Sequence, residues 1–138
     1  NVAASVYFGS DQANPDTSTK FWADLQMYAT QMGPPDPERQ MDRWTSWERA
    51  SKANKWQGRN VSRFSSPDYD ALYRAAEQEL DPVRRASLFV RMNDLVVAAG
   101  YTLPLMHRPN VDAASNRLQL ALSGWGNATG SIADWTRA

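Results

Sequence analysis

The sequence predicts an α/β or α+β domain in which helices flank a small mixed sheet. The strongest observation is a pair of helical patterns between Ser66 and Gly100, where apolar residues recur at the spacing of one helix face. A second observation is that shorter apolar stretches before and after this region have the character of strands. Because helices and strands alternate along the chain, the helices are expected to pack on a sheet.

The composition limits the classes of function. The chain has 138 residues, enough for one domain whose core needs no disulfide or metal. Its 15 basic and 15 acidic residues cancel, so there is no electrostatic reason to expect nucleic acid or an anionic membrane as a partner. With no cysteine and one histidine, cysteine-ligated zinc and multi-histidine metal sites are excluded, and we expect no cofactor. No apolar run approaches the length of about 20 residues that spans a bilayer.

The first third of the chain is predicted to contain two strands. Residues 2–8 have mixed apolar character and predict a strand, which residues 9–16, dense in turn formers, would end. Residues 24–29 alternate apolar and polar side chains, which predicts a half-buried strand with Leu25 and Met27 on one face. The prolines that follow cannot continue a sheet, so this strand is expected to lead into a stiff loop.

A helix is predicted over about residues 38–55. Met41 and Trp44 are expected to face inward, and Trp47 less clearly so. Trp22 and Trp44 lie on the apolar faces of their expected elements, so we expect both indole rings to pack in the core.

The helical hairpin that follows has clear start and stop signals. Its helices begin at Ser66-Pro67 and Asp81-Pro82, where an N-cap side chain precedes a proline at the first helical position. Gly100 can take the left-handed conformation that ends a helix. Since only Asp81 separates the two patterns, the helices must turn back on each other and share their apolar faces. The residues expected on these faces are Tyr69, Leu72, Tyr73, Ala76 and Leu80 in the first helix and Leu88, Phe89, Met92, Leu95, Val96 and Ala99 in the second.

The chain after the hairpin is predicted to contain three short strands, over residues 101–107, 111–115 and 118–122. The apolar residues of the first of these strands need a sheet to enter. Residues 123–130 are too rich in glycine for regular structure, and Ile132–Trp135 is expected to form one turn of helix.

A family resemblance rests on seven stretches, which are Phe21-Trp-Ala-Asp-Leu-Gln-Met-Tyr-Ala29, Pro35-Asp-Pro37, Gly58-Arg-Asn60, Ser66-Pro-Asp-Tyr-Asp-Ala-Leu72, Asp81-Pro-Val-Arg-Arg85, Met92-Asn-Asp94 and Leu103-Pro-Leu105. Taken in order, they resemble the closing part of the extracytoplasmic solute-binding proteins of peptide-type ABC importers, the oligopeptide- and dipeptide-binding family. The resemblance covers residues 1 to about 120. Members of that family are several times longer than this chain, so the resemblance implies a C-terminal portion.

The resemblance implies a fold, a function and a set of contacts. Residues 1–103 would belong to the C-terminal lobe of a two-lobed periplasmic binding protein, and residues 104–138 to a crossover segment that returns toward the first lobe. The protein would capture peptides or similar small solutes, without any reaction, and present them to the membrane permease of an ABC importer. It would work together with the N-terminal part of the same protein, in the periplasm or as a membrane-anchored lipoprotein. Carried over position by position, the ligand-facing residues are Met27, Ala29, Thr30, Gln31, Gly33, Asn60 and Arg63.

One position departs from the family's pattern. If Asp36-Pro37 is aligned to the family's acidic residue and proline, Gly33 stands where peptide binders usually have an acid that pairs with the ligand's α-amino group. An ammonium left unpaired in a closed cleft is strongly unfavourable. Either Asp36 takes that role or the solute is of another kind, such as the sugars and nickel complexes that the family also carries.

The residues by themselves support a binding site at the same place. Open α/β sheets bind ligands at the carboxyl ends of their strands, and Thr30, Gln31 and Asn60 offer neutral donors and acceptors there. The same side chains could instead satisfy the backbone of their own loops.

Two further classes of function stay open. A carbohydrate-binding or hydrolytic domain would use Trp47, Trp56 and His107, because indole rings stack on sugars. The chain has no nucleophile elbow or phosphate-binding loop, which favours a protein that is not an enzyme. A structural interaction domain would show a large apolar patch along the helical hairpin or over residues 118–125.

Overall fold

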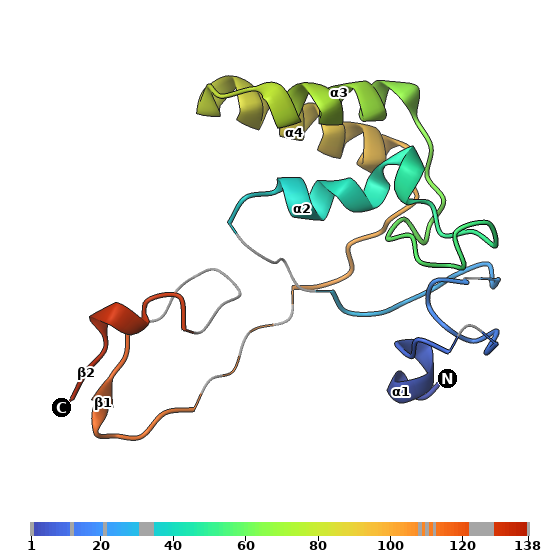
Figure 1. The fold of residues 1–138 in the computed structure, drawn as a ribbon. Coiled ribbons are helices and arrows are strands. Elements are labelled where there is room, and N and C mark those ends of the chain that lie inside the picture. Colours follow the sequence, from blue (N-terminus) through green and yellow to red (C-terminus); the bar gives the residue numbers. More distant parts are fainter. Residues whose placement is uncertain are drawn as a thin grey trace.

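The two longest helices lie side by side as a hairpin, drawn at the top of Figure 1. Helix α3 spans Pro67–Gln78 and helix α4 spans Pro82–Ala98. The computed structural model describes residues 2–11, 13–20, 22–30, 35–107, 109, 111, 113–121 and 129–137. Within these ranges, no helix is long and apolar enough to cross a membrane.

The capping signals predicted for the hairpin are confirmed. The Ser66 hydroxyl accepts a hydrogen bond from the Tyr69 N–H at 3.2 Å, and the Asp81 carboxylate accepts from the N–H groups of Val83 and Arg84 at 3.0 and 2.9 Å. Each cap satisfies backbone donors that have no partner inside the helix. Gly100 follows α4 with a φ of 68°, the left-handed conformation expected of it.

The core lies where α3 and α4 face each other. Its buried members are Phe64, Tyr69, Leu72, Tyr73, Ala76, Phe89, Met92 and Val96. Leu88 and Leu95 are half-buried at its edge, so most of the predicted helix faces are confirmed. Leu80 and Ala99 are exposed instead, because each lies beyond the last turn of its helix and no longer points at the partner helix.

The helix predicted over residues 38–55 is shorter and broken. It consists of α2 (Glu38–Met41) and two single turns of 3₁₀ helix, η1 (Asp42–Trp44) and η2 (Ser46–Glu48). The break falls at the extended residue Thr45, whose hydroxyl donates to the Asp42 carbonyl at 2.7 Å. A hydroxyl that bonds its own backbone competes with the helix in this way. Met41 and Trp44 pack against the core as predicted.

The amino-terminal segment differs from its prediction. A strand was expected over residues 2–8, but the structure has a helical turn, α1 (Ala4–Tyr7). The Ala3 carbonyl accepts from the N–H groups of Val6 and Tyr7 at 3.0 and 2.9 Å, so these donors are satisfied locally rather than by a neighbouring strand.

The sheet is smaller than predicted and antiparallel. Strands β1 (Leu118–Gln119) and β2 (Thr136–Arg137) pair with Leu118 opposite Arg137, and η3 (Ile132–Asp134) precedes β2. The prediction of a strand at 118–122 is therefore confirmed for its first two residues, and the predicted helical turn near residue 132 is confirmed. The molecule is a mixed, helix-dominated fold with one two-stranded sheet, which agrees with the α/β class at a coarse level.

The other predicted strands are not paired in the part of the chain that the structure describes. Residues 24–29 and 101–107 form irregular backbone, and so do the described residues of 111–115. Trp22, predicted to pack in the core, is 73% exposed. A strand is stable only when its backbone groups find a partner, and these segments have none.

Candidate functional site

Segment 22–30, which contains the strand 24–29 that was expected to line a ligand cleft, lies on the surface. Met27, Ala29 and Thr30 are all exposed, and Met27 retains 80% of its accessible surface. The Thr30 hydroxyl accepts a hydrogen bond from Arg43 at 3.1 Å, which attaches the end of the segment to η1. Gln31 and Gly33, the other two residues predicted here, lie outside the described residues.

Aromatic side chains attach this segment to the amino-terminal helix. The rings of Tyr7 and Phe8 lie 5.8 and 6.0 Å from that of Tyr28, measured between centroids. Burial raises the pKa of the Tyr7 phenol, so Tyr7 is neutral at physiological pH. Within the segment itself, Gln26 donates to the Ser18 carbonyl at 3.0 Å. These contacts hold the segment from one side and leave Met27 open.

Arg63 comes from a second loop and reaches the same region. Its guanidinium donates to the Lys20 carbonyl at 2.6 Å, two residues before the exposed segment begins. The guanidinium also lies 5.8 Å from the centre of the Trp56 ring, within the range of a cation–π contact. The structure therefore places Arg63 next to Lys20, which precedes segment 22–30, whereas the predicted ligand residues lie in the second half of that segment and beyond it.

Arg63 holds an unusual backbone conformation. Its φ is 59°, and Lys55 and Trp56 in the same loop have φ values of 54° and 62°. Each such residue is strained by about 1–2 kcal/mol, because the Cβ crowds the following carbonyl. The loop keeps this shape because Phe64, directly after Arg63, is buried in the core against the rings of Trp44 and Tyr69.

Asn60 fixes the beginning of that loop from inside the protein. Its side chain is 1% exposed, and its amide nitrogen donates to the carbonyls of Thr45 and Phe64 at 2.9 and 2.8 Å. The amide oxygen accepts from the Ser62 hydroxyl at 3.1 Å. Both amide hydrogens are thus used within the chain, and in this conformation Asn60 presents neither of them to a solute.

The backbone of Asn60 is equally engaged. Its N–H donates to the Glu48 carbonyl at 2.8 Å and its carbonyl accepts from Ala50 at 3.1 Å, which forms a parallel bridge between the two chain segments. Gly58 makes this approach possible, since a Cβ there would lie only 2.2 Å from the Glu48 carbonyl oxygen. The loop is therefore built around a close backbone contact that only glycine allows.

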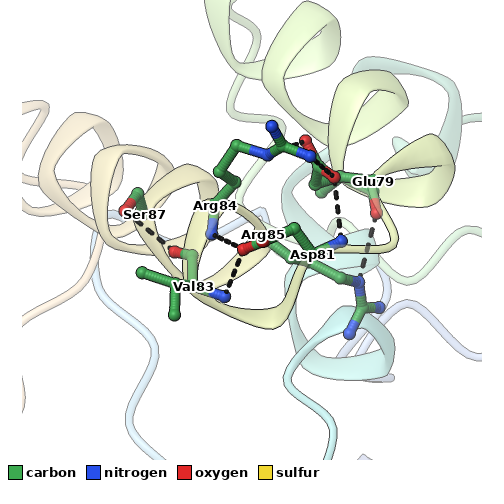
Figure 2. A network of polar contacts seen from close by, with 7 residues as sticks. Glu79, Asp81, Val83, Arg84, Arg85 and Ser87 are labelled. Carbon is green, nitrogen blue, oxygen red and sulfur yellow. Dashed lines mark hydrogen bonds and ion pairs between the residues drawn. The ribbon is translucent and has the colours of Figure 1, made fainter.

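Asp36, the alternative partner for a ligand ammonium, already has a cationic partner. Arg85 donates to its two carboxylate oxygens at 2.7 and 3.2 Å and to Glu38 at 2.5 Å. These hydrogen bonds hold the pKa of the Asp36 carboxyl below its usual range and that of Arg85 above its own. Figure 2 shows Arg85 beside the cap of α4, where Arg84 pairs with Glu79.

Two residues that hold the candidate site were missed in the sequence. Arg43 bonds Thr30, and Asp70 accepts a hydrogen bond from the Ser46 N–H at 2.9 Å, which fastens η2 to α3. No local pattern marks either residue, because each partner lies at least 13 positions away in the sequence. Burial raises the pKa of the Asp42 carboxyl, which precedes Arg43 in the chain.

The residues of the rival carbohydrate or hydrolytic site have other contacts. Trp47 has Arg74 stacked 4.1 Å from its ring centre and Tyr73 against its edge. Trp56 carries Arg63, while His107 is exposed in irregular chain after the hairpin. One face of each indole ring is therefore covered by an arginine. Among the described residues, no group of three or more His, Cys, Asp or Glu side chains is placed to hold a metal ion.

Comparisons with known proteins add no relative to this description. No model of a protein family matches the chain, and no match was found among curated protein sequences or solved structures.

Proposed function

We propose that this chain is the closing part of an extracytoplasmic solute-binding protein of a peptide-type ABC importer. The observation that carries the proposal is the apolar surface of the two segments that the pattern predicts as strands. Leu25 and Met27 in the first segment and Leu103 and Leu105 in the second are each more than two thirds exposed. We take these exposed apolar side chains as a surface that another part of the protein covers.

The remainder of a solute-binding protein would supply that cover. Segments 24–29 and 101–107 carry free backbone donors and acceptors beside their apolar side chains, as strands do before they enter a sheet. Pairing with strands of the complete C-terminal lobe would satisfy both. The helical hairpin would then pack against the sheet, as the predicted fold class requires.

The solute would contact the end of segment 22–30 and the neighbouring loop. We assign contacts to Met27, Ala29 and Thr30, together with the predicted Gln31 and Gly33, and to Arg63 from the second loop. Asn60 has a supporting role in this proposal, because its buried amide holds the loop that presents Arg63. Affinity would come from closure of two lobes that exclude water, and no reaction is involved.

The pairing of Asp36 with Arg85 bears on the kind of solute. An α-ammonium group that approached Asp36 would have to compete with a guanidinium bonded to both carboxylate oxygens. The site is therefore better suited to a peptide held by its backbone, or to a solute without an ammonium group. The other partners in the proposal are the permease of the importer and the N-terminal part of the protein, outside the cytoplasm.

The proposal is tested by solute binding to the complete protein that contains this chain. The probe is an equimolar library of short peptides, and binding is followed by tryptophan fluorescence. Thr30→Val removes the hydroxyl without changing the size of the side chain, and we expect it to weaken binding about tenfold.

The matched control for this variant is Thr19→Val, which lies outside the proposed contacts. It should bind the library as the unaltered protein does, with the same melting temperature. The segment does not bind the solute if Thr30→Val binds the library as tightly as the unaltered protein does, or if both variants lose the same affinity.

A further inference from the structure

A surface groove runs along one side of the helical hairpin. It has a volume of about 650 Å³ and is open to solvent along its length. Every residue that lines it belongs to α3 or α4, namely Asp68, Ala71, Leu72, Ala75, Leu88, Arg91, Asp94, Leu95 and Ala98. The groove is therefore distinct from the candidate solute site, whose residues lie in segment 22–30 and the loop before α3.

The bottom of the groove is lined by apolar side chains, and the residues at its edges have small side chains. Leu88 and Leu95 are half-buried and lie one heptad apart on α4. Exposed alanines flank them, at positions 71 and 75 of α3 and at position 98 of α4. Because an alanine adds only a methyl group, a further helix could approach the hairpin closely enough to contact both leucines.

The charged side chains at the groove have no partner in the part of the chain that the structure describes, unlike others on the same helices. Arg74 pairs with Glu77, and Arg84 pairs with Glu79. By contrast, the exposed side chains of Asp68, Arg91 and Asp94 make no hydrogen bond or ion pair with any described residue. The groove therefore carries charged groups of both signs that can form ion pairs with a partner.

We propose that this groove is the interface with a second copy of the same chain. A two-fold axis that crosses α4 between residues 92 and 93 places the two α4 helices antiparallel. Arg91 of one copy then lies opposite Asp94 of its partner, and the reverse pair forms by symmetry. The same axis brings Leu88 of each copy near Ala98 of the other, so that a large side chain meets a small one. The two hairpins together form a four-helix bundle.

The size of the face predicts a weak association. Helix α4 has 17 residues and so a length of about 25 Å, and two packed helices present a face about 20 Å wide. Two copies would bury about 1,000 Å² in total, which is below the range of about 1,200–2,000 Å² for stable interfaces and within that of weak ones. We therefore expect a monomer–dimer equilibrium that depends on concentration. It does not rest on the proposed function, because it uses none of the residues assigned to the solute.

The dimer is tested by sedimentation equilibrium and native mass spectrometry of the full chain. Arg91→Asp places like charges opposite each other at two symmetric positions, and so does Asp94→Arg. We expect each variant to raise the dissociation constant of the dimer at least about tenfold. The double variant Arg91→Asp/Asp94→Arg restores opposite charges and should regain the dimer.

Mixing the two single variants provides a sharper test. In a heterodimer of Arg91→Asp with Asp94→Arg, both contacts join an acid to a base. The mixture should therefore form heterodimers where each variant alone is monomeric, a result that misfolding cannot produce. Circular dichroism checks that the helices of each variant are intact.

A control substitution separates this face from the back of α4. Val90 is 60% exposed and is not part of the groove, so Val90→Lys should leave the dimer unchanged. The proposal is overturned if the chain is monomeric at every concentration, if dimers persist in Arg91→Asp, if the mixture fails to form heterodimers, or if Val90→Lys is the variant that dissociates the dimer.

Discussion

Asn60 shows how a residue whose chemistry suits ligand recognition can be used inside the protein. The family resemblance and the neutral donors and acceptors of its amide predict a contact with solute. The structure has both of its amide hydrogens on buried carbonyls, those of Thr45 and Phe64. Pattern could not predict this, because the bonds depend on a parallel bridge between residues 49 and 60 that forms only in the folded chain.

Replacement of Asn60 should therefore affect stability first. Asn60→Ala leaves two carbonyl groups without donors in a buried place, and each unsatisfied group costs about 1–3 kcal/mol. We expect the free energy of unfolding to fall by about 3 kcal/mol, measured by urea denaturation. Asn93→Ala, an exposed position on α4, is the matched control and should change it little. A loss in Asn60→Ala no larger than that of the control would mean that the loop does not depend on these bonds.

The elements of the structure divide into those that local sequence specifies and those that it does not. The hairpin was predicted well because its caps and its 3.6-residue period act within a few residues of each other. The segment from residue 38 was predicted as one helix but breaks at Thr45, where a buried hydroxyl bonds the preceding turn. The strand at 24–29 was predicted from alternation and the one at 101–107 from its apolar side chains, yet a strand needs a partner that local sequence does not supply.

The contact between the loop at residue 36 and α4 should make stability depend on pH. Hydrogen bonds from Arg85 lower the pKa of the Asp36 carboxyl from its ordinary value of 3.8. The stabilisation is thus fully present above that value and is lost as the pH falls through the lower pKa of the folded state. Because the Asp36 side chain is half exposed, we expect less than about 1 kcal/mol.

The measurement compares urea unfolding at neutral pH and at about pH 3. Asp36→Asn should reduce the stability at neutral pH and remove part of the loss on acidification. Asp134→Asn, whose carboxyl lies in an exposed 3₁₀ turn, should reproduce the pH dependence of the unaltered protein. If Asp36→Asn does the same, the ion pair with Arg85 contributes nothing measurable.

At the scale of the whole molecule, the fold class was predicted only coarsely. The composition and the hairpin predict a helical layer correctly, and the expected sheet is present as one pair of two-residue strands. Trp22, Leu25 and Leu105 were assigned to a core from their patterns, and the structure leaves all three exposed. Their burial would require non-local pairing, which the described residues do not provide.

For the proposed site, the structure gives the positions of some of the predicted residues. Met27, Ala29 and Thr30 lie on an exposed segment, and Arg63 reaches the residue two positions before it. What sequence could not reveal is the left-handed backbone of Arg63, since nothing local favours that conformation for an arginine. It is imposed by the buried residues on either side of the loop.

The measurement that most directly tests the proposed function is native mass spectrometry of the complete protein that contains this chain, purified without added solute. A closed two-lobed binding protein retains its solute, so we expect a species heavier than the polypeptide by the mass of a peptide or other small molecule. Gentle denaturation should release that mass. A spectrum of bare polypeptide that also gains no mass after incubation with the peptide library would contradict the proposal of solute capture.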